Sequence, residues 1–197
     1  MIIIISNPEP LADEAIIINK LFDAGMELFH LRKPENTKEE LKTLLLKIGS
    51  EHYSKIALHQ HHELAEEFEI KRLHYTEKKR MELKEFKKEN CMLSTSVHSI
   101  KDYKNLSPDF DYAFFGPVFS SISKINYISV IEDDLNLSLN KTSTKIIAIG
   151  GINEENIKNV FDMGFDGAAV LGAIWQKPKE AVNNFKNIHD KCSLTAR

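Results

Sequence analysis

The sequence predicts an α/β fold, a single (β/α)₈ TIM barrel over residues 1–197. Three observations predict it. Eight short apolar runs alternate with helical or polar segments, which is typical of strands and helices that alternate around a parallel sheet. The runs are continuously apolar, as expected for strands buried on both faces. The length suits one domain and lies at the short end for this fold.

Each strand is expected where an apolar run ends in a turn or in a polar cluster. The first run opens the chain, and the last two are closed by glycine. The expected strands are Ile2–Ile5, Leu28–Leu31, Ile56–Leu58, Leu73–Tyr75, Met92–Ser96, Tyr112–Phe115, Ile146–Ile149 and Gly167–Leu171.

The helices between them are expected from apolar periodicity and from residues that start or stop helices. Gly25 and Gly164 follow two of them, and Asn36 or Thr37 can cap a third. The expected helical segments are Leu11–Ala24, Thr37–Ile48, Glu63–Phe68, Glu77–Asn90, a short one from Ser99 or Lys101, Glu132–Leu139, Asn153–Met163 and Pro178–Cys192.

The last two strands and the helix between them form a βαβ unit with glycine at both strand ends. Gly150 and Gly151 end one strand, and Gly172 follows the other. Backbone without Cβ lets an anion approach closely, and free N–H groups at a helix start favour negative charge. Because the last two strands of such barrels often bind phosphate, we expect these glycines to form a phosphate cradle.

A doubly wound open sheet is the competing architecture. Its fingerprint would be a GxGxxG motif after the first strand. The sequence there is SNPEP, so the barrel is preferred.

The overall composition excludes several classes of function. A formal net charge of −3 does not suggest a nucleic-acid binder. No apolar run reaches membrane-spanning length, and MIIIIS lacks a basic leader and a cleavage site. Cys91 and Cys192 form neither a CxxC motif nor a disulfide framework, which fits a reducing cytosol. We therefore expect a cytoplasmic protein, and its oligomeric state, including a possible homo-oligomer, stays open.

Polar residues of one character gather at the expected strand ends. They are cations, hydroxyls and open backbone, with few carboxylates, which suits an anionic ligand such as a phosphate ester. Each residue alone is explained by an ion pair or by an ordinary loop, but together they favour a binding site. The candidates for substrate or phosphate binding are Arg32, Lys33, His59, Ser96, Ser121, Ser123, Lys124, Gly150, Gly151 and Gly172.

The HQHH segment after the third strand has a second interpretation. His59 and His61 would share a face if the strand continued through them, and neutral imidazoles bind zinc. A closed site needs about four ligands, and only Glu63 lies beside them. We therefore predict no metal site and expect one of these histidines to line the cavity.

Five motifs follow one another along the chain. They are FHLRK at the second strand, TSVHS at the fifth, GPVFSSISK after the sixth, AIGGI at the seventh and GFDGAAVLGAI at the eighth. In this order they resemble the motifs of the thiamine phosphate synthase family, which includes the thiazole tautomerases. The resemblance covers essentially the whole chain. It implies a barrel enzyme of thiamine biosynthesis, a transferase or an isomerase, whose partner is a small phosphate ester, a thiazole phosphate.

The chain departs from the family's synthases at three positions. By resemblance, Gln60 and Lys79 stand where the synthases carry aspartates that hold Mg²⁺ on the pyrophosphate leaving group, and Pro34 replaces a lysine. Mg²⁺ prefers hard oxygen ligands, and a lysine repels it. We therefore predict no cofactor, with Mg²⁺ needed only if the synthase hypothesis holds.

Three hypotheses remain, of which the first is preferred. The chain is a metal-independent thiazole tautomerase-like enzyme, a thiamine phosphate synthase with a rearranged metal site, or a non-catalytic phosphate-ligand binder. A tautomerase needs a group that takes and gives a proton near neutral pH, and histidine is that group. His98 is the first candidate for catalysis and His30 the second.

Overall fold

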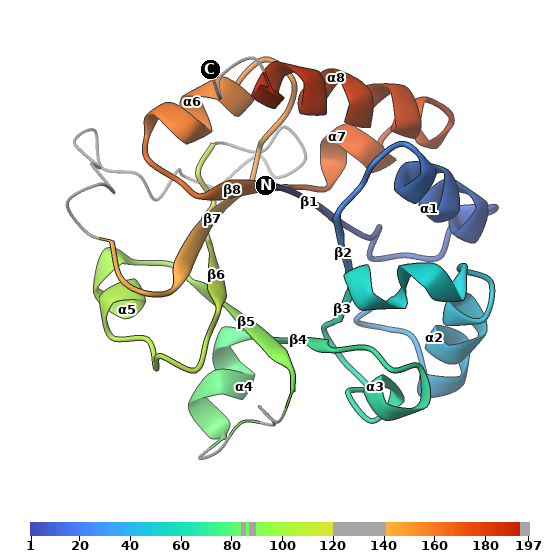
Figure 1. Ribbon diagram of the computed structural model, residues 1–197, viewed down its shortest axis with the longest axis horizontal. Helices are drawn as coiled ribbons and strands as arrows, with labels where there is room; N and C mark the ends of the chain where they lie inside the picture. Colours follow the sequence, from blue (N-terminus) through green and yellow to red (C-terminus); the bar gives the residue numbers. More distant parts are fainter. Residues whose placement is uncertain (84–85, 87–89, 120–140, 194–197) are drawn as a thin grey trace.

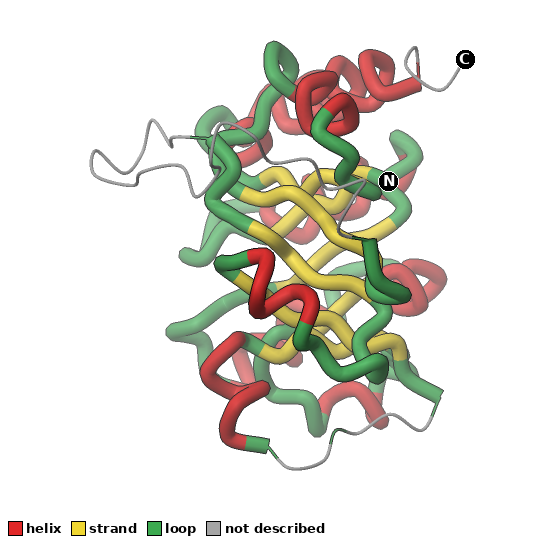
Figure 2. Tube along the Cα trace, turned by 90° about the vertical axis from the view of Figure 1, so that its left-hand side faces the viewer, coloured by secondary structure: helices red, strands yellow, loops and turns green. Residues whose placement is uncertain are grey.

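The computed structural model describes residues 1–83, 86, 90–119 and 141–193. Eight parallel strands pair in sequence order and close into a barrel, with the helices in a ring outside it (Figure 1). Seen from the side, the strands cross the barrel obliquely (Figure 2). The predicted fold class is therefore confirmed. The strands are β1 (Ile2–Ile5), β2 (Leu28–Leu31), β3 (Ile56–Leu58), β4 (Arg72–Tyr75), β5 (Met92–Val97), β6 (Tyr112–Phe115), β7 (Lys145–Ile149) and β8 (Gly167–Val170).

The helices lie outside the barrel, between successive strands. Those that the sequence predicted are shorter in the structure than expected, and both ends of α8 are shifted slightly. They are α1 (Glu14–Asp23), α2 (Lys38–Leu45), α3 (Leu64–Glu67), α4 (Glu77–Glu82), α5 (Ile100–Lys104), α6 (Ile157–Asp162), α7 (Gly172–Trp175) and α8 (Ala181–Ser193), with 3-10 helices η1 (Ser50–Lys55) and η3 (Pro178–Glu180).

Two helix starts were predicted too early, and local backbone chemistry explains both. Asp13 has a left-handed φ of 58°, so α1 begins after it and not at Leu11. The Asn153 side chain accepts from the N–H groups of Glu155 and Asn156, a turn that delays α6. The helix expected at 132–139 lies outside the described residues. The sequence did not predict α7 or η1.

The barrel separates two apolar layers. Side chains such as Ile3, Leu28 and Ile147 fill its interior. A larger cluster, which includes Ile18, Leu41 and Phe185, lies between the strands and the helices. Strands buried on both faces follow from this arrangement, as their continuous apolar runs predicted.

No helix of the described residues is both long and apolar enough to cross a membrane.

A buried ion pair fixes the turn after β2 to α1. The Lys33 ammonium donates to both carboxylate oxygens of Glu14, at 2.7 and 2.6 Å, and to the carbonyl of Glu9 at 2.9 Å. The two side chains are 1% and 5% exposed. Burial raises the pKa of Glu14, and the Lys33 contact opposes that rise. Removing one partner leaves the other charge buried and uncompensated.

We predict that Lys33→Met lowers the free energy of unfolding by about 3–5 kcal/mol, because it leaves the buried Glu14 carboxylate without its counter-charge. The double variant Lys33→Met/Glu14→Leu should regain most of that loss. Urea unfolding followed by circular dichroism measures both. If the double variant were as unstable as the single one, the loss would come from packing and not from the stranded charge.

Candidate active site

A cavity of about 350 Å³ opens at the carboxyl ends of the strands. Arg32, His59, Ser96 and His98, all predicted site residues, line it together with His74 and Glu77. Arg32, His59 and His98 directly follow β2, β3 and β5, and Ser96 lies near the end of β5. His74 lies on β4 and Glu77 on α4. Parallel strands bring these ends to one rim, which is where barrel enzymes carry their chemistry.

Arg32 and Lys78 are the cationic side chains that line this cavity, and Lys78 pairs with Glu82 on α4. The Arg32 backbone is fixed to the end of β1, because Arg32 N donates to Ser6 Oγ and Ser6 Oγ donates to Arg32 O, both at 2.8 Å. Among the described residues its guanidinium has no ion pair. A planar, permanently charged fork with free donors is suited to a phosphate or carboxylate.

His98 is held by one ring nitrogen and open at the other. Its Nδ1 lies 2.7 Å from the carbonyl of Gly116, which can only accept, so Nδ1 carries the hydrogen. Its Nε2 lies 3.9 Å from a Glu77 carboxylate oxygen, and the side chain is 55% exposed. In the neutral ring this leaves the Nε2 lone pair free to accept a proton.

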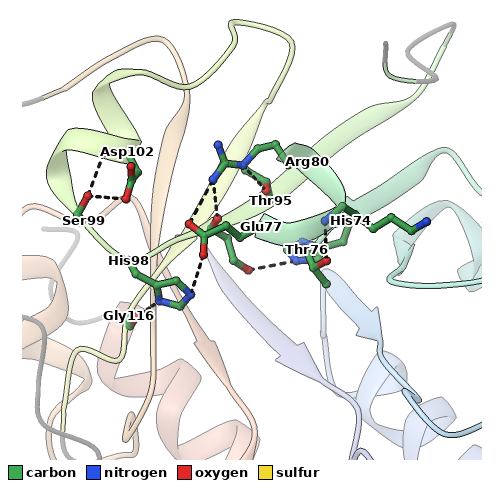
Figure 3. A network of polar contacts seen from close by, with 11 residues as sticks. His74, Thr76, Glu77, Arg80, Thr95, His98, Ser99, Asp102 and Gly116 are labelled. Carbon is green, nitrogen blue, oxygen red and sulfur yellow. Dashed lines mark hydrogen bonds and ion pairs between the residues drawn. The ribbon is translucent and has the colours of Figure 1, made fainter. Parts of the chain in front are cut away.

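Helix α4 is joined to β5 beside His98 (Figure 3). Arg80 donates to Thr95 Oγ1 at 3.2 Å and to the Ser96 carbonyl at 3.5 Å, and it pairs with Glu77 at 3.6 Å. Glu77 therefore lies between Arg80 and His98. No role was predicted for Glu77 from the sequence, because its place in the cavity depends on how α4 packs.

Inside the mouth, three histidine rings lie against one another: His30 of β2, His59 after β3 and His74 of β4. His30 Nδ1 lies 2.8 Å from His59 Nε2, and His30 Nε2 lies 2.7 Å from the Tyr112 hydroxyl. The His59 and His74 rings stack with centroids 4.0 Å apart. We call His30, His59 and His74 the histidine cluster.

Burial disfavours the charged form of all three rings of the histidine cluster. Burial, together with nearby charges, lowers the pKa of His30 and of His59 well below the ordinary value. The same causes lower the pKa of His74 to about 3. His61 and His62 are not part of it, because each points to a backbone carbonyl, of Asn36 and Leu58 respectively.

The glycines of the expected phosphate cradle lie at the ends of β7 and β8, outside the residues that line this cavity. Gly150 and Gly151 have positive φ values of 101° and 65°. A Cβ on Gly150 would lie 2.7 Å from Pro117 Cβ, so this glycine is also needed for packing. Part of the helix start is already used, because Asn153 accepts two of its amides.

The other predicted residues lie elsewhere. Lys33 is buried against Glu14 and does not line the cavity, so a phosphate contact would require this ion pair to open. Ser121, Ser123 and Lys124 lie outside the described residues.

Residues 2–174 match the family model described as thiamine monophosphate synthase. The chain belongs to this family. A thiamine-phosphate synthase of Staphylococcus epidermidis is 28% identical over 169 residues, which are 80% of this chain and 79% of the relative. One of Koribacter versatilis is 38% identical over 79 residues, 40% of this chain and only 37% of the relative.

Solved structures of the family have the same fold. A thiamine phosphate pyrophosphorylase from Bacteroides thetaiotaomicron superposes with a TM-score of 0.82 at 28% identity, covering 100% of this chain and 99% of that one. One from Pyrococcus furiosus gives a TM-score of 0.75 at 16% identity, covering 100% and 96%, and shows the fold alone.

By resemblance, Gln60 and Lys79 occupy the positions of two magnesium ligands in the family's synthases, and neither residue type suits that ion. Lys79 is exposed on α4, and Gln60 has a buried Nε2 without a hydrogen-bond partner among the described residues. Glu77 is the one carboxylate among the described residues lining the cavity, and Arg80 pairs with it. The two-carboxylate magnesium site of the family's synthases therefore does not fit these residues.

Sequence reasoning missed His74, Ser94 and Tyr112, which complete the polar part of the barrel interior. A signal was present. His74 precedes the last residue of its strand, as His30 does, and both alternate with the apolar Leu73 and Leu31. In strands of this period, the two histidines face the same side of the sheet.

We predict that folding stability falls as the pH drops below about 6.5. The histidines of the unfolded chain bind protons in that range, whereas the buried histidines of the folded chain, whose pKa is lowered, do not. One such histidine contributes about 2 kcal/mol of loss between pH 7 and pH 5. Urea unfolding at both pH values should therefore show a smaller difference for His74→Gln than for the wild type.

A His189→Gln variant is the control for loss of a histidine, since that side chain is 50% exposed on α8. If His74→Gln kept the full pH dependence of the wild type, the assignment of that dependence to the histidine cluster would be wrong.

Proposed function

We propose that this chain binds a thiazole phosphate at the carboxyl ends of its strands and joins it to a pyrimidine pyrophosphate, as a thiamine phosphate synthase. Family membership supports the reaction class, and the relatives matched carry that name. The observation that carries the proposal is the Arg32 guanidinium, which has no ion pair among the described residues and lines a cavity of about 350 Å³. Among the hypotheses from the sequence, the comparisons favour this one over the tautomerase.

Arg32 has a defined part in this reaction. When the pyrimidine carbon bonds to the thiazole, its bond to the pyrophosphate oxygen breaks, and negative charge grows on the leaving group. A permanently charged guanidinium in a partly enclosed cavity stabilises that charge. No step here uses Mg²⁺, because Gln60 and Lys79 do not replace two carboxylates.

The thiazole phosphate has its own binding place in the proposal. Gly151 and Gly172 would hold its phosphate through backbone amides at the neighbouring strand ends. Ser121, Ser123 and Lys124, which by resemblance belong to the loop after the sixth strand, would hold the pyrophosphate with Arg32. Lys33 is left out of this set, since its ammonium already makes three hydrogen bonds within the protein.

A second candidate function, thiazole tautomerase, is favoured by one specific observation. His98 has a ring nitrogen fixed by the Gly116 carbonyl and the other nitrogen open beside Glu77. That is the arrangement of a general acid–base, which the synthase reaction does not need in order to expel pyrophosphate.

We predict that Arg32→Gln lowers kcat/KM for thiamine phosphate formation by about 100-fold, the scale for one lost charge-stabilising donor. The assay supplies both synthase substrates, with Mg²⁺ and with a chelator. Lys158→Gln, which removes an exposed cation of α6, is the control and should keep full activity. Absence of product under every condition would reject the synthase proposal.

For the second candidate, the substrate is a thiazole carboxylate phosphate tautomer. If the chain is a tautomerase, conversion survives chelation and falls by at least about 100-fold in His98→Ala. Conversion that is unchanged in His98→Ala, or absent in the wild type, rejects this candidate. Binding of the phosphate ligand without either reaction would leave a non-catalytic binder.

A further inference from the structure

We propose that the histidine cluster is a binding site for a divalent transition metal of the zinc class, within the mouth of the barrel. One ring nitrogen from each of His30, His59 and His74 lies within 4.8 Å of the other two. Ligand nitrogens at about 2.0–2.1 Å from a tetrahedral zinc ion lie about 3.4 Å apart. The pair of His30 and His59 nitrogens at 2.8 Å would open slightly around an ion, and the widest separation would close.

In two of the three rings, the nitrogen that faces away from the cluster already has a hydrogen-bond partner, as in imidazole ligands of metal sites. His74 Nδ1 lies 2.9 Å from Ser94 Oγ, and Ser94 Oγ also lies 3.4 Å from the carbonyl of Leu73, to which it can donate. In the tautomer in which Ser94 accepts from His74 Nδ1, the lone pair of His74 is on Nε2, on the other side of the ring. The Ser96 hydroxyl lies 3.3 Å from this Nε2.

Tyr112 does the same for His30. Its hydroxyl oxygen lies 2.7 Å from His30 Nε2. In the tautomer in which Tyr112 accepts, the lone pair of His30 Nδ1 faces His59, and metal binding selects that tautomer. Outer hydrogen bonds that orient imidazole ligands in this way are a regular feature of metal sites.

The surroundings leave one open side. Phe114 packs against His30 and His74, with ring centroids 4.7 and 5.1 Å away. His59 and His74 also line the cavity, with Arg32 and Ser96. Three protein ligands with a fourth position open to a cavity are typical of catalytic rather than structural zinc sites. The charge of Arg32 opposes a bare dication and favours an anion, such as a phosphate or hydroxide, in that fourth position.

The donor set distinguishes this site from a magnesium site. Neutral imidazoles suit zinc, copper, nickel and cobalt, whereas Mg²⁺ takes oxygen ligands. The alternative is an uncharged hydrogen-bond network that holds no ion. That alternative predicts the same contacts but no stoichiometric metal, so a binding measurement separates the two.

The test is metal binding by the full-length, tag-free chain, treated with a chelator and then dialysed. Zn²⁺ is titrated by calorimetry, and Co²⁺ by its visible absorption, which reports tetrahedral nitrogen coordination. We expect one ion per chain, and an affinity about 100-fold lower in His59→Gln and in His74→Gln. His61→Gln and His62→Gln, which alter neighbouring histidines outside the cluster, should bind as the wild type does.

His59→Gln keeps the test valid if His74→Gln does not fold, because His59 lies at the edge of the cavity and is not fully buried. Absence of a stoichiometric ion overturns the proposal, as does an affinity that is unchanged in His59→Gln or that depends on His61 or His62. The readout is binding and not turnover, so failure of this inference is distinguishable from failure of the proposed synthase activity.

Discussion

Pairing between β1 and β8 is the constraint on which the rest of the structure depends. Ile2, Ile3 and Ile4 pair with Ala168, Ala169 and Val170, and this ladder closes the sheet. The Trp175 indole, from the helix after β8, donates to the Ile5 carbonyl at 2.6 Å and ties α7 to the end of the first strand. Closure brings all the strand ends to one rim, so residues far apart in the chain share one cavity.

The interior of the closed barrel is divided in character. The side formed by β2 to β5 carries histidines and serines, whereas β7, β8 and β1 contribute Ile147, Ala169 and Ile3. Tyr112 and Phe114 of β6 stand at the boundary between the two sides. The aliphatic side therefore secures the barrel, and the polar side carries the groups that can act on a ligand.

The fold was predictable because its signals are local. Each strand is a short apolar run. Thr37 and Ser99 cap the helices that follow them, and each was one of two helix starts that the sequence allowed. The start of α6 was not predictable in the same way. Asn153 is a good cap by type, but its side chain closes a turn of its own, and that choice depends on Asn156 nearby.

The candidate site was predictable in part. Arg32, Ser96 and His98 were expected from their places at strand ends, and they do meet in one cavity. Lys33 follows Arg32 directly in the turn after β2, but its ammonium is held by Glu14 and by the Glu9 carbonyl. The contribution of β4 and β6 was missed, since the position of His74 beside His30 follows from barrel register and not from any motif.

The histidine cluster lowers the stability that the barrel interior could otherwise have. Three imidazoles in a barrel interior, surrounded by side chains such as Phe114 and Leu28, stabilise the native state less than well-packed aliphatic side chains would. Folding alone therefore gives no reason for three imidazoles at these positions, whereas binding of a ligand does.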